Sequence, residues 1–128
     1  MRLIIDTSII IDELRGGKKW NGLVNEFKKN DTELFLPSIV IFEIFSGQSS
    51  KNKKIKDKIN NLLSYFQLID LSEGVAQKAG EIYRDHDSTL GVVDYVIAAT
   101  AMEVGAQIVT LNKKHFSKIP GVSVYQTP

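Results

Sequence analysis

The stretch Leu3-Ile4-Ile5-Asp6-Thr7-Ser8 decides how the fold begins, because three apolar residues are followed at once by three polar ones. A short apolar run closed by residues that favour helix N-termini predicts a buried strand followed by a helix. We expect that strand at residues 3–5 and the helix from Ile9 to Leu14, ended by two glycines. The chain therefore opens in the β–α order that is typical of a parallel sheet.

The same alternation continues along the sequence. Apolar runs predict further strands at residues 34–36, 67–70, 107–111 and 122–125, the last at a sheet edge. Helical spacing of apolar residues predicts helices over residues 19–29, 38–47, 49–66, 75–83 and 92–104. Alternating strands and helices indicate a three-layer α/β/α domain, residues 1–128, whose mostly parallel sheet has four to five short strands.

Composition excludes several kinds of function. The 128 residues include no cysteine, which excludes thiolate metal sites and a cysteine nucleophile. The net charge of +1 gives no overall basic field, so any nucleic-acid contact must rest on local charge. No apolar run is long enough to span a bilayer and no signal peptide is evident, so we expect a cytoplasmic protein without a membrane partner.

Acidic residues from distant parts of the chain should meet at one edge of this sheet. Asp6 and Asn112 each follow a strand, and Asp94 lies in the first turn of a helix that leads into one. Glu43 lies about five residues into the helix after the second strand, roughly 7 Å along its axis. Because carboxyl ends of parallel strands share an edge, the topology predicts that these four residues converge.

Carboxylates gathered without histidine or cysteine favour a hard divalent cation. Mg²⁺ is the expected ion and Mn²⁺ a possible substitute, with Asp6, Glu43 and Asp94 as ligands. Such an ion can activate water and neutralise a phosphate, which are the requirements of phosphodiester hydrolysis.

Each acid also has a purely structural explanation. Asp6 can cap the first helix, and Asp94 can be a first-turn acid favoured by the helix dipole. Glu43 can form a buried ion pair with Arg2 or Arg84. The aromatic residues Trp20 and Phe27 have core-like spacing, which favours packing over base stacking.

Four segments together resemble the PIN-domain family, and more narrowly the VapC-type toxins of toxin–antitoxin pairs. They are Asp6-Thr7-Ser8, residues 41–47 around Glu43, residues 94–101 beginning with Asp94, and residues 109–116 with Pro120-Gly121. The resemblance implies a Mg²⁺-dependent endoribonuclease that hydrolyses RNA, works as a homodimer and is inhibited by a cognate antitoxin. It also implies that Asp6 and Asp94 are the principal metal ligands, with Glu43 as the third acid. Thr110 and Asn112 match the polar pair that orients metal-bound water.

One departure from the family pattern concerns a fourth acid. The family commonly places it where this chain has Asn112, or just before the aromatic residue, where this chain has His115. Asp85 or Asp87 can supply a substitute, or can be solvated residues at a helix end. The departure makes a second metal ion less expected.

Two basic segments can contact a nucleic-acid backbone. Residues 51–58 carry five lysines and one aspartate, which suits phosphate contacts or a solvated helix face. Lys113 and Lys114 lie at the predicted site and are the better candidates for backbone contact.

Two other functions compete with the nuclease hypothesis. A phosphoacceptor signalling domain would use Asp70 as acceptor, Asp6 as a Mg²⁺ ligand and Lys113 as a phosphoryl contact, but leaves Glu43 and Asp94 without a task. A catalytically weak PIN-like module that only binds nucleic acid is the other, prompted by the missing acid.

Overall fold

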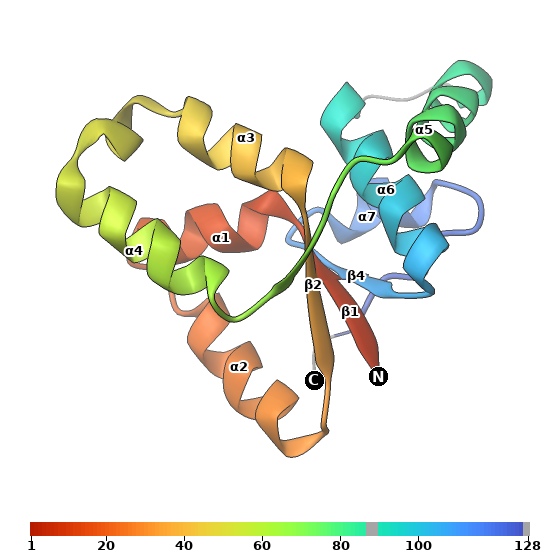
Figure 1. Ribbon diagram of the computed structural model, residues 1–128. Helices are drawn as coiled ribbons and strands as arrows, with labels where there is room; N and C mark the ends of the chain where they lie inside the picture. Colours follow the sequence, from red (N-terminus) through yellow and green to blue (C-terminus); the bar gives the residue numbers. More distant parts are fainter. Residues whose placement is uncertain (87–89, 127–128) are drawn as a thin grey trace.

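The structure, a computed structural model, describes residues 1–86 and 90–126 and contains one parallel sheet (Figure 1). Its four strands are β1 (Arg2–Ile5), β2 (Glu33–Pro37), β3 (Gln67–Ile69) and β4 (Gln107–Val109). They lie in the order β3-β2-β1-β4, and each neighbouring pair is parallel. The prediction of a short-stranded, parallel α/β fold is therefore confirmed.

Helices cover both faces of this sheet. Figure 1 shows α1, α2 and α4 on one side and α5, α6 and α7 on the other, with α3 above the strand ends. The helices are α1 (Thr7–Leu14), α2 (Lys19–Lys29), α3 (Ser38–Ser46), the 3₁₀ helix η1 (Gln48–Lys51), α4 (Lys53–Leu63), α5 (Glu73–Asp85), α6 (Val92–Val104) and α7 (Lys113–Ser117). Among the described residues, no helix has the length and apolar character needed to cross a membrane.

The core lies between these layers. Leu3, Ile4 and Ile5 of the central strand are fully buried, as expected for a strand covered on both faces. Trp20 is also buried and packs its ring against Phe66, with ring centroids 5.4 Å apart. Phe27 is buried as well, so the core interpretation of both aromatic residues is confirmed.

The single helix predicted over residues 49–66 is wrong in its extent. The structure has the short η1 helix first, and α4 begins only after Asn52. Asn52 has extended backbone angles, and its side chain accepts hydrogen bonds from the amides of Lys54 and Ile55. An asparagine cap of this kind starts a new helix and so interrupts the old one.

The fifth strand, predicted at residues 122–125, is reduced to one bridge. Val124 pairs with Ile108 of β4 in parallel, through hydrogen bonds from Ile108 N–H to Ser123 and from Tyr125 N–H to Ile108. The edge position was correctly predicted, but the pairing does not extend into a strand.

Candidate active site

The carboxyl ends of the strands lie at one edge of the sheet, and the predicted site residues follow them. Ile5 pairs with Val109, so the next residues, Asp6 and Thr110, leave adjacent strands side by side. Glu43 comes from α3 and Asp94 from the first turn of α6. The structure therefore assembles the site from the beginning, middle and end of the chain.

Asp6 is the buried centre of the site, with only 2% of its surface exposed. Its Oδ2 accepts hydrogen bonds of 2.7 Å from both Ser8 Oγ and Thr110 Oγ1. Its side chain makes no capping hydrogen bond to α1, although Asp6 stands at the position before that helix. The explanation of Asp6 as a helix cap is therefore wrong, because its carboxylate is held by hydroxyl groups instead.

The same hydroxyl groups hold the loop after β4. The amide of Leu111 donates to Ser8 Oγ at 3.0 Å, and the amide of Asn112 donates to Thr110 Oγ1 at 2.9 Å. Each hydroxyl thus accepts from the backbone while it donates to Asp6. Thr110 thus contacts Asp6 through its side chain, whereas Asn112 contacts Thr110 through its backbone amide, and the predicted role of this pair in orienting water stays a prediction.

Glu43 is held at the site by Thr7. Thr7 Oγ1 donates a 2.5 Å hydrogen bond to Glu43 Oε1, which joins the start of α1 to the middle of α3. The alternative ion pairs do not form, since Arg2 pairs with Glu33 and Arg84 with the neighbouring Asp85. Glu43 therefore faces the candidate site and not a cation of the protein core.

Asp94 shows most directly that the acids converge. Partial burial raises the pKa of its carboxyl, and the charges of Asp6 and Glu43 raise this pKa further. The Gly91 amide, which donates to Asp94 Oδ2 at 3.2 Å, and the charge of His115 act in the opposite direction. Asp94 thus supports the start of α6 and also lies within electrostatic reach of two other acids.

The candidates for a substitute fourth acid do not join this cluster where the structure describes them. Asp85 is exposed and forms a two-point ion pair with Arg84, whose hydrogen bond lowers the pKa of the Asp85 carboxyl. Asp87 lies outside the described residues. His115, in contrast, lies close enough to Asp94 for its charge to lower the pKa of that carboxyl.

The donor chemistry of this cluster fits a hydrated divalent cation. In the described part of the chain, the recorded hydrogen bonds reach Asp6 only at Oδ2 and Glu43 only at Oε1. Their second oxygens and the Asp94 carboxylate provide the hard ligands that Mg²⁺ and Mn²⁺ prefer. Among residues 1–86 and 90–126, no three acidic or imidazole groups already stand in a formed metal site. An ion that keeps several waters and takes one or two carboxylates is compatible with both observations.

Sequence reasoning missed Thr7 and Ser8 as members of the site. The sequence alone predicts a helix cap at these positions, which is the usual role of hydroxyl residues after a strand. Their partners, Glu43 and Thr110, lie 36 and 102 residues away along the chain. The signal that could have revealed them is their position directly after Asp6, because a buried carboxylate needs hydrogen-bond donors and two hydroxyl groups follow it.

The parallel sheet and the acids that meet at its carboxyl edge place the chain among α/β proteins whose functional site is built from carboxylates. The chain belongs to the PIN-domain family: the family model described as "PIN domain" matches residues 3–122. Within that family it is similar to proteins named VapC. Ribonuclease VapC19 of Mycobacterium tuberculosis is 31% identical, with 91% of this chain and 94% of the relative covered. Ribonuclease VapC1 of Rickettsia felis is 34% identical, covering 97% and 95%.

Solved structures agree with this assignment. The VapBC2 complex of Rickettsia felis, bound to a DNA fragment from its promoter, matches at a TM-score of 0.85 and 25% identity over the whole of both chains. The DNA-bound VapBC complex of Salmonella typhimurium matches at 0.83 and 22% identity, over 98% of this chain and 97% of that one. The second likeness shows the fold alone.

Proposed function

We propose that this chain is a Mg²⁺-dependent endoribonuclease, the toxin of a type II toxin–antitoxin pair. The observation that carries the proposal is the convergence of Asp6, Glu43 and Asp94 at the strand ends, where burial, and then the charges of Asp6 and Glu43, raise the pKa of Asp94. Acids held together at this cost indicate a site for a cation. The relatives named ribonucleases support RNA as the substrate, and an RNA substrate favours a cytoplasmic location.

In the proposed reaction, a water oxygen bonds to the phosphorus of an RNA phosphodiester and the bond to the leaving ribose oxygen breaks. Asp6, Asp94 and Glu43 would hold Mg²⁺, or Mn²⁺ in its place, which when bound lowers the pKa of water and neutralises phosphate charge. Ser8 and Thr110 fix the Asp6 carboxylate, and Thr7 fixes Glu43. Asn112 lies exposed in the loop after β4, where its side-chain amide can contact the attacking water or the phosphate.

The competing phosphoacceptor function fits the sheet less well. Asp70 follows β3, and β2 separates that strand from β1 and Asp6. An acceptor and its metal ligand would therefore leave the sheet two strands apart, whereas Asp6, Glu43 and Asp94 interact. We accordingly use Asp70 as the control acid.

The decisive experiment incubates purified protein with single-stranded RNA and either Mg²⁺, Mn²⁺ or a chelator. We expect cleavage by the wild type with either ion, no cleavage with chelator, and a loss of at least about a hundredfold in Asp6→Asn. Asp70→Asn, a matched change of an exposed acid, should cleave like the wild type. Intact RNA with both wild type and Asp6→Asn, across titrations of both ions, would establish a non-catalytic binding module instead.

We further propose an antitoxin partner, since the similar solved structure from Rickettsia felis is a VapBC2 complex. Expression of the chain alone should slow growth, and co-expression with its cognate antitoxin should restore growth. Equal growth in both cultures would contradict the toxin assignment. Asp6→Asn expressed alone serves as the control and should not slow growth.

A homodimer is the last part of the proposal. Between α5 and α6 a cavity of about 220 Å³ is lined almost entirely by apolar groups. Leu71, Tyr83 and Val92 of this lining are 46%, 54% and 65% exposed, which favours burial against a second copy. Sedimentation velocity should show a dimer for the wild type and a shift to monomer for Val92→Glu, and a monomeric wild type would contradict the proposal.

A further inference from the structure

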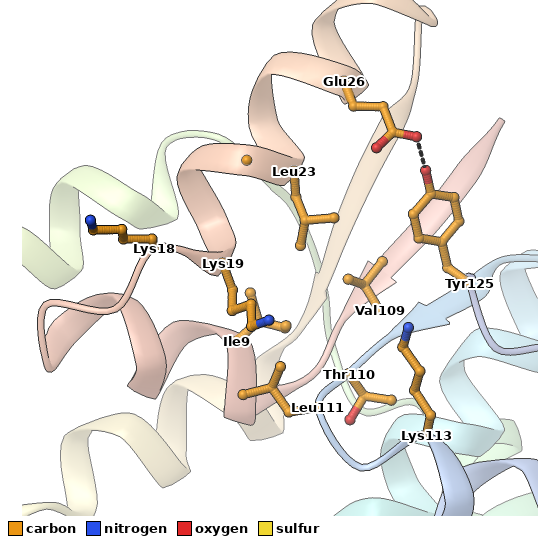
Figure 2. A pocket seen from close by; sticks show the side chains of 11 residues that line it. Ile9, Lys18, Lys19, Leu23, Glu26, Val109, Thr110, Leu111, Lys113 and Tyr125 are labelled. Carbon is orange, nitrogen blue, oxygen red and sulfur yellow. Dashed lines mark hydrogen bonds between the residues drawn. The ribbon is translucent and has the colours of Figure 1, made fainter. Parts of the chain in front are cut away.

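A second cavity, of about 490 Å³, opens directly beside the acidic site (Figure 2). Thr110 belongs to both, because it lines the cavity and donates its hydroxyl hydrogen to Asp6. The remaining walls come from α1, from α2 and Lys18 before it, from β4 and the loop after it, from Lys113 of α7 and from Tyr125. A volume of this size falls within the range of cavities that bind small organic groups.

The cavity is polar at one end. Figure 2 shows the amines of Lys19 and Lys113 directed into it near Thr110, while the amine of Lys18 points away. In the described part of the chain, the recorded ion pairs do not include Lys19. Two ammonium groups in a cavity beside the acidic site would attract the phosphates of a nucleic-acid strand that runs through the cavity and the site.

The other end of the cavity carries the opposite charge. Glu26 lies there and accepts a hydrogen bond from the hydroxyl of Tyr125 (Figure 2). Figure 2 shows the apolar side chains of Leu23 and Val109 between the two ends, while Ile9 and Leu111 lie at the lysine end. A phosphate is therefore favoured beside the lysines and repelled by Glu26, whereas a planar base can lie against the apolar middle.

We propose that this cavity binds one nucleotide of single-stranded RNA adjacent to the phosphodiester at the acidic site. The phosphate of that nucleotide contacts Lys19 and Lys113, and its base lies against Leu23 and Val109. This inference rests on the proposed ribonuclease function for its substrate, but it concerns binding and not cleavage. Such a subsite fixes where the strand lies relative to Asp6 without requiring a particular base.

Binding can be measured in an Asp6→Asn background, using the change in fluorescence anisotropy of a fluorescein-labelled single-stranded RNA 12-mer of mixed sequence. We expect Lys19→Glu to raise the Kd about tenfold and to reduce the slope of log Kd against log salt by about one. Lys28→Glu, an exposed lysine in the last turn of the same helix, should change the Kd less than twofold.

A second variant tests whether RNA binding needs the volume of the cavity, whereas Lys19→Glu tests its charge. Gly22 lines the cavity from α2, and a Cβ built there meets nothing within 4 Å. Gly22→Gln should therefore fold normally, fill the cavity and raise the Kd about as much as Lys19→Glu. Circular dichroism and the Tm of each variant verify folding.

The outcomes separate this inference from the proposed function. Weaker binding by Lys19→Glu and Gly22→Gln supports the subsite even if the wild type fails to cleave RNA. Unchanged binding by both variants, or no RNA binding by the Asp6→Asn parent, overturns the subsite even if the wild type cleaves. If Lys19→Glu and Gly22→Gln bind RNA like their parent but no longer form a complex with the antitoxin, the cavity belongs to the protein partner. That result also overturns the proposed nucleotide subsite.

Discussion

Thr7 Oγ1 lies 2.5 Å from Glu43 Oε1 and donates a hydrogen bond to it. Thr7 is buried, and it is the first residue of α1, so its position is fixed by the strand and helix on either side. Glu43, in the middle of α3, gains nothing from the helix dipole and depends on this contact for its orientation. The Glu43 carboxylate is therefore oriented by a residue of another helix, α1, that directly follows Asp6 in the chain.

Removal of this contact should impair cleavage more than folding. Thr7→Val keeps the shape of the side chain but removes the hydroxyl, so Glu43 can turn away from the site. We expect a loss of about tenfold to a hundredfold in kcat/KM, typical when the hydrogen-bond partner of a metal ligand is removed. Thr7→Ser retains the donor and should restore most of the activity. Equal rates for Thr7→Val and the wild type would show that the contact has no catalytic role.

Thr110→Val should reduce the free energy of unfolding. The buried Asp6 carboxylate then loses one of its two hydroxyl donors, and the amide of Asn112 loses its acceptor. A buried polar group without a partner costs about 1–3 kcal/mol, which urea unfolding followed by circular dichroism can measure. Thr110→Ser, which preserves the hydroxyl, is the control. An unchanged urea midpoint in Thr110→Val would contradict this account of how Asp6 is held.

Asp94→Asn should stabilise the protein in the absence of metal ions while it abolishes cleavage. Because burial and neighbouring acids raise the pKa of Asp94, the stability linked to this group is greatest below the ordinary aspartate pKa of about 3.9. It is lost as the pH rises through the raised pKa. We expect the Tm at pH 7 to increase by about 3 °C, with the difference vanishing near about pH 3.

The comparison with Asp94→Ala separates the two roles of this residue. Asparagine can still accept the hydrogen bond from the Gly91 amide, whereas alanine cannot. Asp94→Ala should therefore gain less stability than Asp94→Asn. A Tm for Asp94→Asn below that of the wild type at pH 7 would argue against repulsion among the acids.

Tyr125 should lose its proton only in strong alkali. Its hydrogen bond to Glu26, with burial and the Glu26 charge, raises the pKa of Tyr125 to about 12. A phenol with a raised pKa contributes stability that is fully present below its unfolded value of about 10 and is lost as the pH rises through about 12. Absorbance titration at alkaline pH should show one late-ionising tyrosine in the wild type and none in Tyr125→Phe. Its presence in both proteins would assign the late ionisation to another residue.

The sequence predicts the fold well because local pattern and topology agree. The apolar run of residues 3–5 and the helical spacing from Trp20 to Phe27 each correspond to a buried element. The interruption at Asn52 was missed because an asparagine cap and a polar residue on a helix face look alike in one dimension. The strand predicted at residues 122–125 is too long, because an apolar run does not reveal how many backbone hydrogen bonds the adjacent strand β4 can form with it.

For the candidate site, likewise, the sequence predicts which acids meet but not the contacts that hold them. Topology brings Asp6, Glu43 and Asp94 together, because strand ends and helix starts share one edge of a parallel sheet. It does not specify which donors hold each carboxylate. Ser8 could have bonded to the helix that follows it, and only the packing of β4 beside β1 directs it to Asp6 and Leu111.

The central strand β1 pairs with β4, whose residues follow it by about a hundred positions, and Asp6 receives a hydroxyl from Thr110 only through that pairing. During translation, the first acid leaves the ribosome long before its partner has been synthesised. A chain made only as far as α6 therefore has Asp6, Glu43 and Asp94, but it lacks β4 and the Thr110 hydroxyl that holds Asp6. An enzyme assembled in this order would hold its complete site only once Thr110 has been synthesised and β4 has paired with β1.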